Sequence, residues 1–218
     1  MDALLTRQLL DAMPQEWKGT TFRNSNLLGR EEFSKGLIAL LDSRNAENPI
    51  TTTDLDALGM AEDYLRVASN PSTTLETLLA RRKGCITSHV ISFGSFVMPI
   101  VAVAITTPGT LHCYTGEAEA PLSAIALDLL KLLGASVEFH AGAPQAGAHG
   151  DEVVLRLEST IIDTGNDATY PENDSHGVVT PNVLHILNPA VIQPTEIEII
   201  RKRMSTPATT PVALYMMD

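Results

Sequence analysis

Residues 110–140, TLHCYTGEAEAPLSAIALDLLKLLGASVEFH, decide the fold that this sequence predicts. Residues 111–114 and 136–140 alternate apolar and polar side chains, which is the pattern of strands with one buried face. The run 121–133 between them has helical spacing and is followed by Gly134, a residue that commonly ends helices. A helical crossover of this length joins parallel strands, so the stretch predicts one strand-helix-strand unit.

Upstream, residues 2–83 have the spacing of four short helices. The first two are expected around residues 4–12 and 33–41, and the third is expected to begin at Thr52. The fourth is expected to begin with Asn70 as its N-cap and Pro71 in its first turn, and to end just before Gly84. After residue 84, apolar runs rich in valine and isoleucine predict strands at 101–106 and 153–157. Residues 183–187 are ambiguous, and a helix is expected over 195–204.

These patterns predict a mixed α and β protein, with a helical N-terminal part followed by a small α/β portion. The helical part covers residues 1–83, an acidic α/β part covers 84–205, and an extended apolar tail covers 206–218; together they are expected to form one cooperative domain. Internal repeats at periods of 20 to 50 residues are absent from the sequence, which excludes solenoids and propellers.

The composition excludes several classes of function. The 218 residues include 15 Lys and Arg against 26 Asp and Glu, a net charge of −11, which disfavours nucleic acid and acidic membrane surfaces as partners. The apolar run 86–105 is interrupted by polar residues and Pro99, which favours a buried segment over a membrane span. The N-terminus has no signal-peptide pattern and there are only two cysteines, so we expect a cytoplasmic protein with reduced thiols.

Charge is unevenly spread along the chain. Residues 117–187 hold eleven acids and two bases, whereas the first 83 residues are nearly balanced. Basic clusters can bind the acidic face of a neighbouring copy, or they can simply complement helix dipoles in water. Apolar residues at both chain ends would fray unless covered. We therefore expect an interface between copies that includes Leu4, Leu5, Leu9, Arg81, Arg82, Leu214 and Met216.

Two groups of side chains carry metal-ligand chemistry, because imidazole and carboxylate suit zinc, manganese or iron. The first group is His140, His149, Asp151 and Glu152. The second is Asp163, Asp167, Glu172, Asp174 and His176. The second group lacks the glycine at position 6 and the glutamate at position 12 of a calcium-binding EF-hand loop, and a solvated acidic loop is the alternative for it.

Other candidate chemistry is limited. Two cysteine-histidine pairs could supply a nucleophile and a base: Cys113 with His112, and Cys85 with His89. The side chains of Cys113 and His112 point to opposite faces if this segment is a strand. Cys85 and His89 would share a face only on a helix. The turn Thr115, Gly116 and Glu117 is a candidate ligand-binding site, since it lies between a strand and a helix start. Glycine-rich phosphate-binding motifs are absent from the sequence.

Several short motifs follow an order that resembles cystathionine γ-synthase-type pyridoxal-phosphate enzymes. They are Tyr64-Leu65-Arg66, Asn70-Pro71, Leu75-Glu76, Leu157-Glu158-Ser159, Asp174 and Thr180-Pro181. The resemblance implies that Tyr64 and Arg66 hold the cofactor phosphate and that Asp174 meets the pyridine nitrogen. The sequence departs from the family in the spacing between its Tyr and Asn and in lacking the Ser-x-Gly-Met signature. In addition, Lys202 does not lie in the Ser-x-x-Lys motif that the family would have, and the chain is shorter than the family's fold requires. We therefore leave the cofactor unassigned.

Two functions of different class follow from these patterns. The favoured one is a non-catalytic, self-associating structural subunit of an intracellular or viral assembly. The alternative is a small α/β enzyme or ligand-binding domain with a site near residues 115–119 and 160–177, at the ends of the strands. Enzymatic activity stays open at this point, because active sites can combine residues that lie far apart in the chain.

Overall fold

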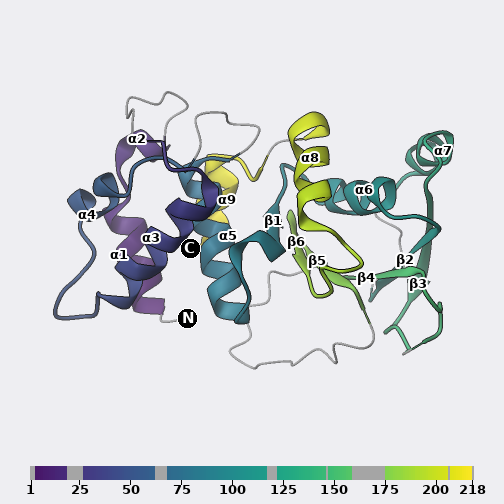
Figure 1. Cartoon of the computed structure of the whole chain (residues 1–218), viewed down its shortest axis with the longest axis horizontal. Helices are drawn as coiled ribbons and strands as arrows, with labels where there is room; N and C mark the ends of the chain where they lie inside the picture. Colours follow the sequence, from purple (N-terminus) through teal and green to yellow (C-terminus); the bar gives the residue numbers. More distant parts are fainter. Residues whose placement is uncertain are drawn as a thin grey trace. The chain divides into compact units, whose positions relative to one another are not determined.

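The structure is a computed structural model that describes residues 3–18, 27–61, 68–116, 122–145, 147–158, 175–205 and 207–217. The chain forms two compact units, unit 1 with residues 1–94 and 205–218, and unit 2 with residues 95–204 (Figure 1). Unit 1 is mainly helical, while unit 2 combines helices with a sheet. The fold is therefore mixed α and β, as the sequence predicts.

Unit 1 confirms the four helices expected from its sequence. Its elements are α1 (Ala3–Ala12), α2 (Gln15–Lys18), α3 (Arg30–Asp42), α4 (Thr52–Ala57), α5 (Asn70–Lys83), the 3-10 turn η1 (Thr87–His89), β1 (Val90–Ser92) and α9 (Thr210–Met217). The short helix α2 was not expected. The tail, expected to be extended, instead forms α9, where Pro211 occupies the first turn and removes no helical hydrogen bond.

Helix α5 is the central element of unit 1. Ser69, rather than Asn70, is its N-cap and forms a capping box with Ser72, and Gly84 ends it at φ 67°, the left-handed conformation that glycine adopts without strain. The helix contacts α2, α3, β1 and α9, and α9 also contacts α1. The apolar ends of the chain therefore pack within unit 1 of the same molecule.

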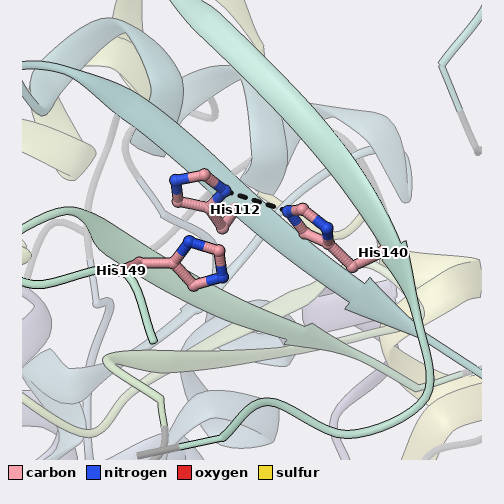
Figure 2. A group of neighbouring side chains, drawn as sticks. All are labelled: His112, His140 and His149. Atoms are coloured by element: carbon pink, nitrogen blue, oxygen red, sulfur yellow. Dashed lines mark hydrogen bonds between the residues drawn. The ribbon is translucent and has the colours of Figure 1, made fainter. Parts of the chain in front are cut away.

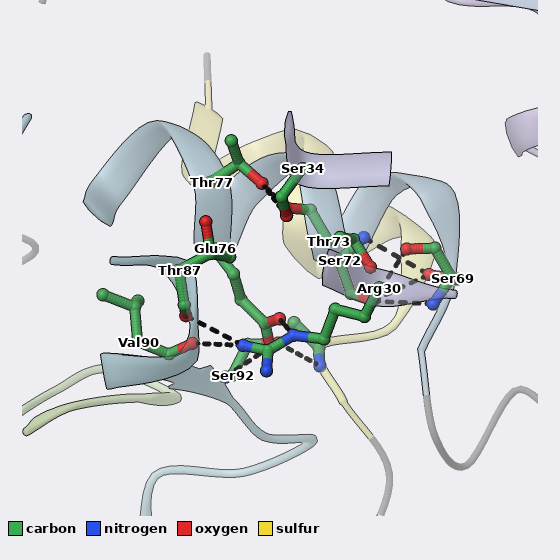
Figure 3. Close-up of polar contacts among 11 residues, drawn as sticks. Arg30, Ser34, Ser69, Ser72, Thr73, Glu76, Thr77, Thr87, Val90 and Ser92 are labelled. Atoms are coloured by element: carbon green, nitrogen blue, oxygen red, sulfur yellow. Dashed lines mark hydrogen bonds and ion pairs between the residues drawn. The ribbon is translucent and has the colours of Figure 1, made fainter. Parts of the chain in front are cut away.

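A buried ion pair and its hydrogen bonds join four of these elements, α3, α5, η1 and β1 (Figure 3). Glu76 of α5 has no exposed side-chain surface and accepts a 2.7 Å hydrogen bond from Nε of Arg30, which is 12% exposed. The other carboxylate oxygen accepts the backbone N–H and the hydroxyl of Ser92, both at 2.8 Å. Arg30 also donates to the carbonyls of Thr87 and Val90. The pair is thus compensated by hydrogen bonds, as a buried charge requires.

Unit 2 contains the predicted strand-helix-strand unit. Its elements are α6 (Val97–Thr106), β2 (Thr110–Thr115), α7 (Ala124–Leu132), β3 (Ser136–Ala141), β4 (Val153–Leu157), β5 (Gly177–Thr180), β6 (Val183–Ile186) and α8 (Pro194–Met204). The strands of this unit lie in the order β6-β5-β4-β2-β3. Strands β2 and β3 pair in parallel, which confirms the crossover expected from residues 110–140.

The prediction of a strand at residues 101–106 was wrong, because this run belongs to α6. A short apolar run rich in β-branched residues does not by itself distinguish a buried helix from a buried strand. The ambiguous run 183–187 is mostly β6, paired antiparallel with β5. The turn that connects β5 to β6 has Pro181 followed by Asn182, and φ 63° at Asn182 fits a type II turn.

Each helix of the described residues falls short of the length and hydrophobicity that a membrane span requires.

Candidate metal centre

The register of three parallel strands gathers polar side chains on one face of the sheet in unit 2. His112 of β2 lies opposite Glu138 of β3, and Tyr114 lies opposite His140. Residues that alternate along a strand share a face, so these four side chains point to the same side while Cys113 points to the other. Glu152 immediately precedes β4, which pairs with β2 on its other side.

Three histidines from two strands and a loop meet on this face (Figure 2). Nδ1 of His112 lies 2.9 Å from Nε2 of His140, and the ring of His149 stacks on that of His112 with centroids 3.6 Å apart. One nitrogen from each ring lies within 4.8 Å of the others. His149 comes from the connection between β3 and β4, so this connection brings the third imidazole to the sheet.

Carboxylates and a phenol surround the three rings. Nε2 of His112 lies 2.8 Å from Oε2 of Glu152, which also accepts the backbone N–H of Thr110 through Oε1. Tyr114 forms a 2.7 Å hydrogen bond with Nε2 of His149. Oε2 of Glu138 lies 3.6 Å from Nδ1 of His112 and 3.9 Å from Nε2 of His140. Glu152 therefore orients His112, while Glu138 lies beside the two paired nitrogens.

The electrostatics favour a neutral imidazole at His149 and an ionised carboxylate at Glu152, since the pKa of each is lowered. Burial lowers the pKa of His149, and the nearby charges of His112 and His140 lower it further. The hydrogen bond from His112, together with that from the Thr110 backbone, lowers the pKa of Glu152. Neutral imidazole is the protonation state that binds metal ions, and an ionised carboxylate is the best acceptor for the second ring N–H.

A cavity of about 490 Å³ adjoins the histidines. It shares Tyr114 and His140 with the cluster and is otherwise lined by Phe139, Ala141, Ala143, Gln145 and Ala148. The volume lies within the range of small-molecule sites. The cluster thus has a space beside it that a small ligand can enter.

The structure brings together only part of the first metal-ligand group expected from the sequence. His140, His149 and Glu152 lie in the cluster, whereas the exposed Asp151 is not in the histidine group. His176 lies apart: its Nδ1 accepts the backbone N–H of Val154, and burial lowers its pKa. Asp163, Asp167, Glu172 and Asp174 lie outside the described residues, as do Tyr64 and Arg66 of the motif resemblance.

His112 was not expected as a ligand, although the sequence held a signal for it. His112 and His140 occupy alternate positions of two predicted parallel strands, and pairing these strands in register would have placed both on one face. The pair His112 and Cys113 point to opposite faces, as expected of a strand. Cys85 and His89 do not share a helix, since only η1 covers His89.

The candidate turn at the end of β2 is only partly described. Thr115 closes the strand and its carbonyl accepts the N–H of Gly142, Gly116 is exposed, and Glu117 lies outside the described residues. A ligand-binding role for this turn therefore stays a prediction.

The expected interface residues lie in unit 1. Among the apolar residues, Leu9 is buried and Leu4 is exposed, and the half-buried ones are Leu5, Leu214 and Met216. Arg81 forms an ion pair with Asp42 at 2.6 Å, and Arg82 is half-buried. Because the chain ends pack within this unit, their apolar character no longer requires a second copy. Self-association through these residues and cytoplasmic location stay predictions, as does the expectation that the net charge disfavours nucleic acid as a partner.

Comparisons with known proteins place the chain in no family. No protein-family model and no curated protein matches the sequence. Among solved structures, metB from Corynebacterium glutamicum is 14% identical, with 71% of this chain and 51% of that chain covered and a TM-score of 0.44. An aminotransferase from Mycobacterium tuberculosis is 12% identical, with 100% and 71% covered and a TM-score of 0.41. The chain spans about half the length of the first of these.

The two free cysteines differ in their exposure to solvent, and we expect them to differ in reactivity. Cys113 has no exposed surface, and burial raises its pKa to about 12 from the ordinary 9.0, so about 1,000-fold less thiolate is present at pH 8 than for an ordinary cysteine. Cys85 is half-buried and its pKa is also raised by burial. Iodoacetamide at pH 8 should modify Cys85 in the native protein and Cys113 only in denaturant, as read by mass spectrometry. Equal labelling of both in the native state would refute this.

Proposed function

We propose that this protein is a small α/β metalloenzyme that holds one divalent transition metal, zinc by its donor set, at His112, His140 and His149. The observation that carries the proposal is the convergence of three imidazole nitrogens within 4.8 Å of one another. Catalytic zinc sites use three protein ligands of this kind and leave a fourth position for water. The 2.9 Å between His112 and His140 is a hydrogen-bond distance, so the rings must separate slightly to hold an ion between them.

The surrounding residues support a catalytic rather than a closed structural site. Glu152 fixes the orientation and tautomer of His112 through the ring nitrogen that faces away from His140. Glu138 is 59% exposed and lies beside the donor nitrogens, where it is positioned to accept a proton from a water molecule. A zinc ion held in such a site lowers the pKa of its bound water to about 7 and so supplies a nucleophile at neutral pH. The adjoining cavity provides room for the substrate.

Calorimetric titration with Zn²⁺ tests the binding, and Co²⁺ substitution tests the open position. We expect one ion per chain, and we expect azide to change the visible spectrum of the Co²⁺-loaded protein, since azide replaces an exchangeable water. Absence of zinc binding would contradict the whole proposal. If azide changes the spectrum of Glu138→Gln but not that of the unsubstituted protein, Glu138 is a fourth ligand and the site is structural, which would contradict the enzymatic part.

Glu152→Gln should weaken Zn²⁺ binding about 10–100-fold while leaving the stoichiometry at one, because an amide orients His112 less well than a carboxylate does. The matched control is Asp151→Asn, which removes the same charge from the neighbouring exposed position and should leave the affinity within about twofold. Equal weakening in both variants would show that only the summed negative charge matters, contrary to the orienting role of Glu152.

A further inference from the structure

Tyr114 connects the histidine cluster to the cavity beside it. Its phenol oxygen lies 2.7 Å from Nε2 of His149, and its ring stacks on that of His140 with centroids 4.9 Å apart. The same side chain lines the cavity of about 490 Å³. A hydroxyl donates only one hydrogen bond, so what Tyr114 offers to a ligand in the cavity depends on whether it donates to His149 or accepts from it.

Neighbouring side chains determine which nitrogen of each ring is left for a metal ion. Nε2 of His112 bonds to Glu152, which leaves Nδ1, the nitrogen that faces Nε2 of His140. Nε2 of His149 bonds to the phenol of Tyr114, which leaves Nδ1 of that ring. A metal-bound histidine normally gives its second ring N–H to an outer partner of this kind. The ligand atoms are therefore Nδ1 of His112, Nε2 of His140 and Nδ1 of His149.

Metal binding through Nδ1 of His149 fixes the direction of its hydrogen bond with Tyr114. A neutral imidazole carries one ring hydrogen, and in the metal-free ring this hydrogen can lie on either nitrogen. Either the phenol or the imidazole can then be the donor. Once Nδ1 binds the metal, the hydrogen lies on Nε2, so His149 donates and the phenol oxygen accepts. The O–H of Tyr114 is thereby released to donate to a different acceptor.

The cavity indicates the chemistry of that acceptor. Apart from Tyr114 and His140, its described lining consists of a phenyl ring, three alanines and Gln145, and it holds no carboxylate, ammonium or guanidinium group. Oε2 of Glu138 lies 3.9 Å from Nε2 of His140, so the protein itself repels an anionic ligand. We propose that the cavity takes a small neutral carbonyl compound, an amide or an ester, whose oxygen accepts the Tyr114 hydrogen bond that metal binding makes available. This inference deepens the proposed function and rests on it.

Long-range proton–nitrogen NMR of the full chain, labelled with ¹⁵N at histidine, tests which nitrogens bind the metal. With one equivalent of Zn²⁺, we expect metal on Nδ1 and hydrogen on Nε2 of both His112 and His149. Zinc bound to Nε2 of His149, with hydrogen on Nδ1, would overturn this inference and leave the proposed metal site intact. Histidine signals that do not respond to Zn²⁺ would contradict the metal site itself, and this inference with it.

Titration with benzamide, followed by backbone amide shifts, tests the ligand. At saturating Zn²⁺, Tyr114→Phe should bind benzamide about 5–10-fold more weakly than the unsubstituted protein, because one hydrogen bond is lost. Without zinc, the two proteins should differ less, since binding of metal and of ligand are coupled through Tyr114. The matched control is Tyr215→Phe, at an 82% exposed tyrosine of unit 1, which should leave the affinity unchanged. No benzamide binding to the zinc-loaded protein, or equal affinity in Tyr114→Phe and the unsubstituted protein, would overturn the proposal.

Discussion

Replacing Glu76 with alanine is expected to lower the free energy of unfolding of unit 1 by about 3–5 kcal/mol. The carboxylate is fully buried and accepts hydrogen bonds from Arg30 and from both donors of Ser92. Its removal takes from the 12% exposed guanidinium the carboxylate that it binds at 2.7 Å, and it takes from the Ser92 N–H an acceptor at 2.8 Å, both in a site of low dielectric. Native proteins are stable by about 5–15 kcal/mol, so this single change removes a large share of the total.

Urea unfolding followed by tryptophan fluorescence measures this effect in unit 1, because Trp17 is the only tryptophan of the chain and is buried there against Phe33. The matched control is Glu31→Ala, which breaks an exposed ion pair with Lys35 and should leave the free energy of unfolding almost unchanged. Glu76→Gln, which keeps acceptors for Ser92, should fall between the two. A loss no greater for Glu76→Ala than for Glu31→Ala would contradict a structural role for the buried pair.

His112→Ala is expected to reduce Zn²⁺ affinity by more than about 1,000-fold. His112 is the central ring of the cluster: it lies 2.9 Å from His140, stacks on His149 and is held by Glu152. Loss of a ligand must exceed the 10–100-fold effect of losing an outer-shell partner, since a direct bond to the metal disappears. Competition with a chelating dye of known zinc affinity covers the range.

The matched control is His89→Ala, which removes an imidazole from η1, outside unit 2. This variant should bind zinc as tightly as the unsubstituted protein. If His112→Ala keeps full affinity, or if His89→Ala loses as much, the zinc is held elsewhere and the three-histidine site is wrong. Far-ultraviolet circular dichroism of both variants would confirm that their folds are retained.

The fold could be predicted where local pattern and tertiary role agree. The alternation of residues 111–114 and 136–140 around a helical run was sufficient to predict β2, α7 and β3 and their parallel pairing. The prediction for residues 101–106 was wrong because valine and isoleucine favour strands, and because a run that is apolar at almost every position lacks the periodicity that marks an amphipathic helix. The tail was expected to be extended, but its residues 210–217 form α9, and Pro211 lies in the first turn, where proline is tolerated.

The sequence grouped only those residues of the candidate site that lie close together along the chain. His140, His149 and Glu152 lie within twelve residues of one another, so proximity along the chain grouped them. His112 lies 28 residues before His140 and joins the group only once the register of β2 and β3 is known. Asp151 has the right chemistry, but it is exposed in the turn before β4, whereas the carboxylate of Glu152 lies 2.8 Å from Nε2 of His112.

Zinc K-edge X-ray absorption of the full chain with one equivalent of Zn²⁺ tests the central claim most directly. The account predicts a first shell of three nitrogen donors at about 2.0–2.1 Å with the multiple-scattering pattern of imidazole, plus one light oxygen donor. Six oxygen donors without imidazole scattering would mean that zinc does not bind at His112, His140 and His149, and would contradict the account.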